Sequence, residues 1–279
     1  MEVIIAKPSG FCSGVAVTIS KLQQALKNKK ASTTIYCYNS PVHNTFVVRE
    51  LEKKGLKVIS SLEQITSSGT LAISAHGAAP HVLNTALKTG MKILDTTCPK
   101  VLRAQKQAKA MSLDGCRVFI LGDENHPEVK GISGFCNNKT EVINIKKPLP
   151  QIDKSEKIGL VAQTTQSILD FKNICKAINI KTDNFYSVNT ICLATQERQK
   201  AALELAKKVD LMLVIGDKKS ANTKRLYELC KTKVETFQIQ SINDLQNSWF
   251  DNINTVGITA GASTPKNIID DVIKELSKN

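Results

Sequence analysis

The stretch "ILDTTCPKVLRAQ" at residues 93–105 joins an apolar run to a polar–apolar periodic segment, with a cysteine and a proline at the junction. The apolar run indicates a strand, and the periodic segment with Pro99 in its first turn indicates a helix. Cys98 therefore lies where a strand ends and a helix begins. Taken alone, the junction is compatible with four roles for Cys98: a small buried hydrophobic residue, half of a disulfide, a nucleophile or a metal ligand.

Strand-like runs alternate with helix-like segments through nearly the whole chain. The runs are rich in Val, Ile and Leu without strict alternation, which is typical of strands covered on both faces. Amphipathic segments such as residues 15–28 and 196–209 separate them. We therefore predict an α/β fold with mostly parallel sheets. The predicted strands are residues 2–6, 34–38, 56–59, 70–75, 92–95, 117–122, 141–145, 158–163, 186–190, 211–216, 234–239 and 255–260.

Three cysteines repeat the strand–cysteine–helix junction. Cys12, Cys98 and Cys192 each stand between a predicted strand and a predicted helix, 86 and 94 residues apart. This spacing predicts three α/β lobes related by pseudo-threefold symmetry, at residues 1–97, 98–191 and 192–279. No low-complexity linker separates the lobes, so we expect one compact body.

Composition indicates a soluble protein. The 279 residues are 42% apolar and 23% charged, and the longest apolar runs are far shorter than a membrane span. The chain opens without a secretory signal pattern, so we expect a cytoplasmic protein that does not bind membranes. The net charge of +13 comes from 38 basic residues, of which 33 are Lys, scattered without an Arg-rich stripe. This pattern favours a solvated lysine-rich surface over a nucleic-acid interface, and a small anionic substrate is compatible with it.

The other five cysteines call for a different interpretation. A reducing compartment argues against disulfides despite the even count of eight. Cys37, Cys116, Cys175 and Cys230 are predicted to be small core residues, and Cys136 stays ambiguous.

Polar residues collect just after the predicted strands. In open parallel sheets, ligands bind outside the carboxyl ends of the strands. His43, His76 and His126 follow strands, as do the three repeated cysteines and many Ser, Thr and Asn residues, whereas His81 fits an ordinary early-helix position. Helix N-termini favour thiolates and phosphates. The residues thus predict an anion-binding pocket with a three-thiolate centre, which could hold zinc or an iron–sulfur cluster.

A set of motifs in fixed order resembles the 4-hydroxy-3-methylbut-2-enyl diphosphate reductase family over essentially the whole chain. The motifs are "GFCSGV", "PVHN", "SAHGA", "DTTCP", "HPEV", "QTT", the segment around "ICLATQERQ", "GDKKSAN" and "TAGAST". Each motif alone is weak, but the ordered set is specific. The resemblance implies a three-lobed α/β fold around a central cavity that holds a metal cluster.

The resemblance also implies the site residues. A [4Fe-4S] cluster would be held by Cys12, Cys98 and Cys192, and Glu128 would deliver protons. The substrate-binding residues implied are His43, His76, His126, Thr164, Ser220, Asn222 and Ser263. One departure is Ala221, where the family commonly has a second serine before the asparagine.

The activity implied is reductive dehydroxylation of a small diphosphate substrate, with two electrons and two protons, to isopentenyl and dimethylallyl diphosphate. The sequence shows no glycine-rich dinucleotide fingerprint, so we expect an external electron donor, a ferredoxin or flavodoxin. Two alternatives from the residues alone are a zinc-dependent hydrolase of a phosphorylated molecule and, on charge only, an RNA-binding module.

Overall fold

The structure is a computed structural model that describes residues 1–137 and 140–278. Over these residues it contains twelve β-strands and nine α-helices, and every strand pair is parallel. The chain divides into two compact units. Unit 1 comprises residues 1–16, 43–47 and 192–279, and unit 2 comprises residues 17–42 and 48–191.

Unit 1 contains one four-stranded sheet with the order β1-β12-β10-β11. Side chains from alternate positions of β10 reach opposite faces of this sheet. Leu211, Leu213 and Ile215 pack with α9, whereas Met212 and Val214 pack with α7 and α8. Both faces are therefore covered, as the unbroken apolar runs predict. The elements are β1 (Glu2–Ile5), β10 (Leu211–Ile215), β11 (Glu235–Ile239), β12 (Thr255–Ala260), α7 (Leu193–Ala206), α8 (Ala221–Lys231), α9 (Lys266–Leu276), η2 (Ile242–Asp244) and η3 (Asn247–Phe250).

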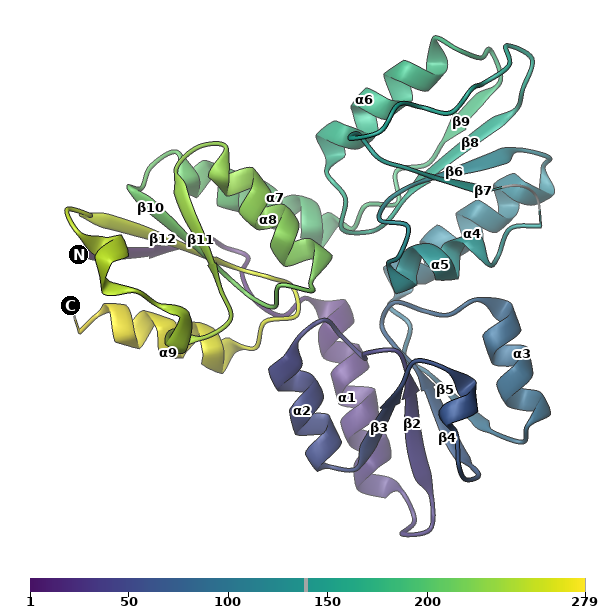
Figure 1. Ribbon diagram of the computed structural model, residues 1–279, viewed down its shortest axis with the longest axis horizontal. Coiled ribbons are helices and arrows are strands. Elements are labelled where there is room, and N and C mark those ends of the chain that lie inside the picture. Colours follow the sequence, from purple (N-terminus) through teal and green to yellow (C-terminus); the bar gives the residue numbers. More distant parts are fainter. Residues whose placement is uncertain (138–139, 279) are drawn as a thin grey trace. The chain divides into compact units, whose positions relative to one another are not determined.

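The first sheet of unit 2 has the order β3-β2-β4-β5. Buried Tyr36, Leu71 and Ile73 pack with Val82 and Ala86 of the helix that follows β4. Figure 1 shows helices lying beside the sheet. The elements are α1 (Ser13–Asn28), β2 (Thr34–Tyr38), α2 (Thr45–Lys53), β3 (Leu56–Ile59), η1 (Leu62–Gln64), β4 (Gly69–Ile73), α3 (Pro80–Lys88) and β5 (Lys92–Asp95).

The second sheet of unit 2 has the order β7-β6-β8-β9. Phe119 and Leu121 of β6 pack toward α6, and Val118 and Ile120 pack toward α4 and α5. The elements are α4 (Pro99–Leu113), β6 (Arg117–Leu121), α5 (Pro127–Ser133), β7 (Thr140–Ile143), β8 (Ile158–Ala162), α6 (Ile168–Asn179) and β9 (Phe185–Ser187) (Figure 1).

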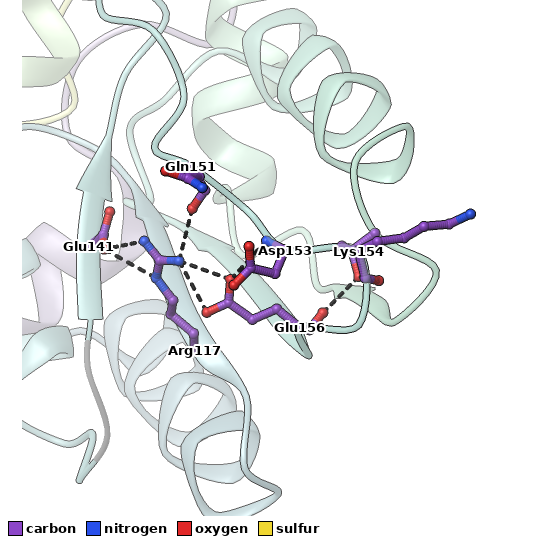
Figure 2. Close-up of polar contacts among 7 residues, drawn as sticks. Arg117, Glu141, Gln151, Asp153, Lys154 and Glu156 are labelled. Atoms are coloured by element: carbon purple, nitrogen blue, oxygen red, sulfur yellow. Dashed lines mark hydrogen bonds and ion pairs between the residues drawn. The ribbon is translucent and has the colours of Figure 1, made fainter.

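Arg117 ties together the amino-terminal edge of this second sheet. Its guanidinium donates to Glu141 on β7, to both carboxylate oxygens of Glu156 at 3.0 Å, and to the Gln151 carbonyl at 3.1 Å (Figure 2). All three charged side chains are partly buried. Because Arg117 is the first residue of β6, this network lies opposite the carboxyl edge where ligands bind, and we assign it to stability.

The α/β fold and all twelve predicted strands are confirmed, with small shifts at the ends. One strand differs in its partner: β1, which we predicted in the first lobe, pairs with β12 of the third. Local periodicity identifies a strand but does not reveal a partner some 250 residues away. The proposed lobe boundaries stay a prediction. No helix in the described part of the chain has the length and apolar character needed to cross a membrane.

Candidate active site

The three repeated cysteines lie at equivalent places in the fold. Cys98 is the N-cap of α4 and Cys192 is the N-cap of α7. Cys12 directly precedes α1, where its carbonyl accepts from the Ala16 N–H at 3.0 Å and its Sγ lies 3.4 Å from the Val15 nitrogen. All three side chains are half-buried, and none of the eight cysteines forms a disulfide. All three thiols thus stand at helix starts, and the Cys12 Sγ accepts from a backbone N–H there.

Four other cysteines were predicted to be small core residues, and the prediction is confirmed for three of them. Cys37, Cys116 and Cys230 are fully buried among apolar neighbours, and burial raises the pKa of Cys37 and of Cys230 to about 12. Cys175 is half-buried at the edge of the α6 cluster. Burial also raises the pKa of Cys116 and of Cys175, so these four thiols disfavour the reactive thiolate.

In unit 1, the segment 43–47 is fixed by hydrogen bonds to two strand exits. The Thr45 N–H donates to Asp217 Oδ2 at 2.9 Å, and the Thr45 hydroxyl donates to the same oxygen. The Ser263 hydroxyl donates to the His43 carbonyl at 2.8 Å. Burial lowers the pKa of His43, and the nearby Asp217 carboxylate opposes this effect. Sequence reasoning missed Asp217 as a contributor, although it lies within the quoted "GDKKSAN" motif.

The start of α8 presents a polar side chain without a partner. Ser220 is the N-cap, and its hydroxyl accepts from the Thr223 N–H at 3.3 Å. Asn222 is 4% exposed, yet neither its Oδ1 nor its Nδ2 has a hydrogen-bond partner among the described residues. Leaving a buried amide unsatisfied costs about 1–3 kcal/mol. A polar ligand at this helix start would satisfy the amide and would use the positive end of the helix dipole.

In unit 2, Glu128 and Thr164 form a buried pair. Glu128 is 2% exposed; its Oε1 accepts from the Thr164 N–H at 2.6 Å and its Oε2 from the Thr164 hydroxyl at 2.9 Å. Burial raises the pKa of Glu128 to about 7, although both hydrogen bonds from Thr164 act to lower it. A carboxyl that titrates near neutral pH is suited to deliver protons.

Unit 2 also contains two predicted site histidines that contact each other. The rings of His76 and His126 meet edge to face, with centroids 5.2 Å apart. His126 Nδ1 accepts from the Glu128 N–H at 3.1 Å, so a neutral His126 carries its proton on Nε2. The Cys98 N–H donates to the Ala75 carbonyl at 3.0 Å, which places the start of α4 next to the residue preceding His76.

Every predicted site residue follows the carboxyl end of a strand in the sequence. Unit 1 contributes Cys12, His43, Cys192, Ser220, Asn222 and Ser263, and unit 2 contributes His76, Cys98, His126, Glu128 and Thr164. Fold and residues together define an α/β protein with three parallel sheets. Its thiols, imidazoles and one buried carboxyl stand at the ligand-binding edges of those sheets.

Comparisons with known proteins identify the family. Residues 3–277 match the family described as "LytB protein". The chain therefore belongs to the LytB family. It is 39% identical over 279 residues to the 4-hydroxy-3-methylbut-2-enyl diphosphate reductase of Geobacter sulfurreducens, covering all of this chain and 98% of that protein. It is 35% identical to the Wolbachia pipientis protein of the same name, covering all of this chain and 92% of the relative.

Solved structures agree with these relatives. One is described as (E)-4-hydroxy-3-methyl-but-2-enyl diphosphate reductase, the terminal enzyme of the non-mevalonate pathway. It matches with a TM-score of 0.71 and 35% identity, and each chain is covered completely. Another, described as the E-1-hydroxy-2-methyl-but-2-enyl-4-diphosphate reductase from Plasmodium falciparum, matches with a TM-score of 0.91 and 28% identity, covering 99% of this chain and 88% of that one.

Proposed function

We propose that this chain catalyses the reductive dehydroxylation of (E)-4-hydroxy-3-methylbut-2-enyl diphosphate to isopentenyl diphosphate and dimethylallyl diphosphate. Family membership and similarity over the full length support this activity. The structural observation that carries it is the buried Glu128 carboxyl, hydrogen-bonded to Thr164, with a pKa of about 7. The reaction replaces a C–OH bond by a C–H bond, consumes two electrons and two protons, and releases water.

The chain's thiols fit a [4Fe-4S] cluster. Cys12, Cys98 and Cys192 would hold it, because each presents a half-buried thiol at the positive end of a helix. When bound, such a cluster supplies the electrons and leaves one iron open to the substrate hydroxyl. Zinc would also accept three thiolates, but it has no redox chemistry with which to perform a reduction.

Glu128 and Thr164 deliver the protons. A protonated Glu128 can pass its proton toward the leaving hydroxyl through the Thr164 side chain, which lies 2.9 Å from Oε2. The same pair orients the hydroxyl, because Thr164 can donate and accept at once. Burial keeps water away from the carboxyl, so its proton is held for the substrate.

The diphosphate would be bound by His43, His76, His126, Ser220, Asn222 and Ser263. The unpartnered amide of Asn222 at the start of α8 supports this role for unit 1. The neutral Nε2–H tautomer of His126 supports a donor role in unit 2. We propose an external electron donor, a ferredoxin or flavodoxin, because the sequence has no fingerprint for a dinucleotide of its own.

An anaerobic preparation tests this function. We expect brown protein with broad absorbance near roughly 400 nm, and iron and sulfide in about equal amounts. The Cys98→Ser variant should lose iron, and Cys175→Ser should retain it, because Cys175 lies in the apolar α6 cluster. A colourless protein that takes up zinc and no iron, or full iron content in Cys98→Ser, would contradict the proposal.

A further inference from the structure

Arg198 lies buried on α7, six residues after Cys192. Its side chain is 3% exposed. Nη1 donates to the Ala194 carbonyl and Nη2 to the Gly10 carbonyl, both at 2.8 Å, and Nε has no partner among the described residues. One guanidinium therefore joins the residue two positions after Cys192 to the residue two positions before Cys12.

The two joined segments are themselves well fixed. Gly10 has a φ of +78°, and a Cβ there would lie 2.9 Å from Ile269 Cδ1 and 3.2 Å from the Thr264 carbonyl oxygen. The Cys12 N–H donates to the Ala262 carbonyl at 3.1 Å. Because Arg198 connects the Gly10 carbonyl to the first turn of α7, its planar fork restricts the separation of Cys12 and Cys192.

The charge of Arg198 lacks a counter-ion in the described residues. Its hydrogen bonds to Ala194 and Gly10 go to neutral carbonyls, and no carboxylate of the described residues forms an ion pair with it. Burial lowers its pKa, while the Cys12 and Cys192 thiols and the exposed neighbour Glu197 raise it. A buried cation without an anion is costly, so proteins normally place a negative group beside it. Apart from the exposed Glu197, the ionisable groups beside this cation are two of the three proposed metal ligands.

We infer that Arg198 is a positioning residue of the metal centre: it fixes Cys12 relative to Cys192 and supplies the positive charge that balances an anionic three-thiolate cluster. The inference rests on the proposed function, because it requires the cluster. A nearby fixed cation favours the more negative, reduced state of the centre. Loss of this cation should therefore make the cluster harder to reduce.

Three variants test the inference: Arg198→Met removes the charge and the bridge, Arg198→Lys keeps the charge and loses the fork, and Arg103→Met is the control. Arg103 is exposed on α4, five residues after Cys98. Each protein is loaded with iron and sulfide anaerobically, and its redox titration is followed by electron paramagnetic resonance. Iron loss to a chelator is timed in parallel.

In Arg198→Met, the ratio of reduced to oxidised cluster at the wild-type midpoint should fall about tenfold, which is about 59 mV for one electron. Arg198→Lys should keep a ratio within about twofold of wild type but lose iron several-fold faster, and Arg103→Met should match wild type. A folded Arg198→Met with the wild-type midpoint would overturn the inference. If Arg198→Met does not fold, wild-type iron retention in Arg198→Lys would overturn it. Wild-type protein that binds no cluster would instead refute the proposed function on which it rests.

Discussion

Glu128 combines full burial with a carboxyl that titrates near neutral pH. Its two oxygens are occupied by the backbone and hydroxyl of Thr164, so the side chain has one fixed orientation. Burial disfavours the charged form and raises the pKa to about 7. The carboxyl is therefore about half protonated at neutral pH and mostly protonated below it, so a proton is available at the start of a turnover cycle.

The Glu128→Gln variant should separate catalysis from stability. Gln has the same shape but cannot donate a carboxyl proton, so turnover should fall by about 10²–10⁴-fold with unchanged iron content. The control is Glu124→Gln, an exposed acid in the loop that precedes α5, which should retain wild-type activity. Turnover measured with a small-molecule reductant decides the outcome, and near-wild-type activity of Glu128→Gln would remove Glu128 from the mechanism.

Glu128 should also make stability depend on pH. Its folded pKa of about 7 lies above the ordinary value of 4.5, so between these values the folded protein binds more protons than the unfolded chain. The free energy of unfolding therefore falls as the pH rises through this window. Glu128→Gln should melt at a higher temperature than wild type at about pH 8, with the gain vanishing toward about pH 5. Thermal melts of both proteins without iron provide the measurement, and a gain that did not depend on pH would contradict this account.

Ala221 offers a second test at the residue scale. It is the first residue of α8 and lies between the N-cap Ser220 and Asn222. The family that the sequence resembles commonly has serine at this position. Ala221→Ser adds a hydroxyl at the positive end of the helix, worth about 1 kcal/mol for one hydrogen bond. The KM for the diphosphate substrate should fall about fivefold, with kcat unchanged. Ala221→Gly adds no such group and serves as the control; equal KM values for Ala221→Ser and wild type would count against a phosphate contact at this position.

The segment 43–47 depends on a contact between elements far apart in the sequence. Asp217, after β10, accepts from the Thr45 N–H and hydroxyl with Oδ2 and from the Lys219 N–H at 2.8 Å with Oδ1. Burial raises the pKa of this carboxyl, but the hydrogen bonds from Thr45 and Lys219 outweigh it and hold the pKa below the ordinary value. The carboxylate is thus an anchor for the segment that carries His43.

The Asp217→Asn variant should weaken this anchor. An amide cannot accept as strongly, and hydrogen bonds to charged groups contribute about 1.5–3 kcal/mol. The KM for the diphosphate substrate should rise about 10–100-fold, with a smaller change in kcat, because His43 is displaced and Glu128 is not. Asp270→Asn, which removes an exposed pairing with Lys266, should leave both constants unchanged. A loss confined to kcat would contradict a role in substrate binding.

Across the molecule, the three sheets repeat one topology. Each sheet has four strands in the spatial order second, first, third and fourth, counted along the repeat. The orders are β3-β2-β4-β5, β7-β6-β8-β9 and β11-β10-β12-β1. β1 thus acts as the fourth strand of the third sheet. In each repeat the fourth strand is followed by a cysteine and then a helix, at Cys98, Cys192 and Cys12. The equivalence of the three cysteines is therefore a property of the topology as well as of the spacing.

The sequence predicts what local pattern controls. Strands, helix starts and the cysteine junctions follow from apolar periodicity and from residues such as Pro99, and all appear in the structure. Contacts across long separations carry no local signal. The pairing of β1 with β12, the 172-residue contact of Thr45 with Asp217 and the 188-residue contact of Arg198 with Gly10 were accessible only from the structure. The spacing of the cysteines alone left both zinc and an iron–sulfur cluster open. The family resemblance supplied the choice of the cluster and the roles of the individual residues.

The net charge of +13 bears on the proposed external electron donor. Ferredoxins and flavodoxins that are acidic would be attracted by this field, so association should depend on ionic strength. Between about 10 and 100 mM salt, the Debye length falls from about 30 to about 10 Å. The kcat/KM for an acidic protein donor should then fall by about tenfold or more, whereas the rate with an uncharged small-molecule donor should stay constant. Stopped-flow reduction of the cluster-loaded protein at several salt concentrations measures both, and equal salt dependence for the two donors would mean that the lysine-rich surface has no part in donor binding.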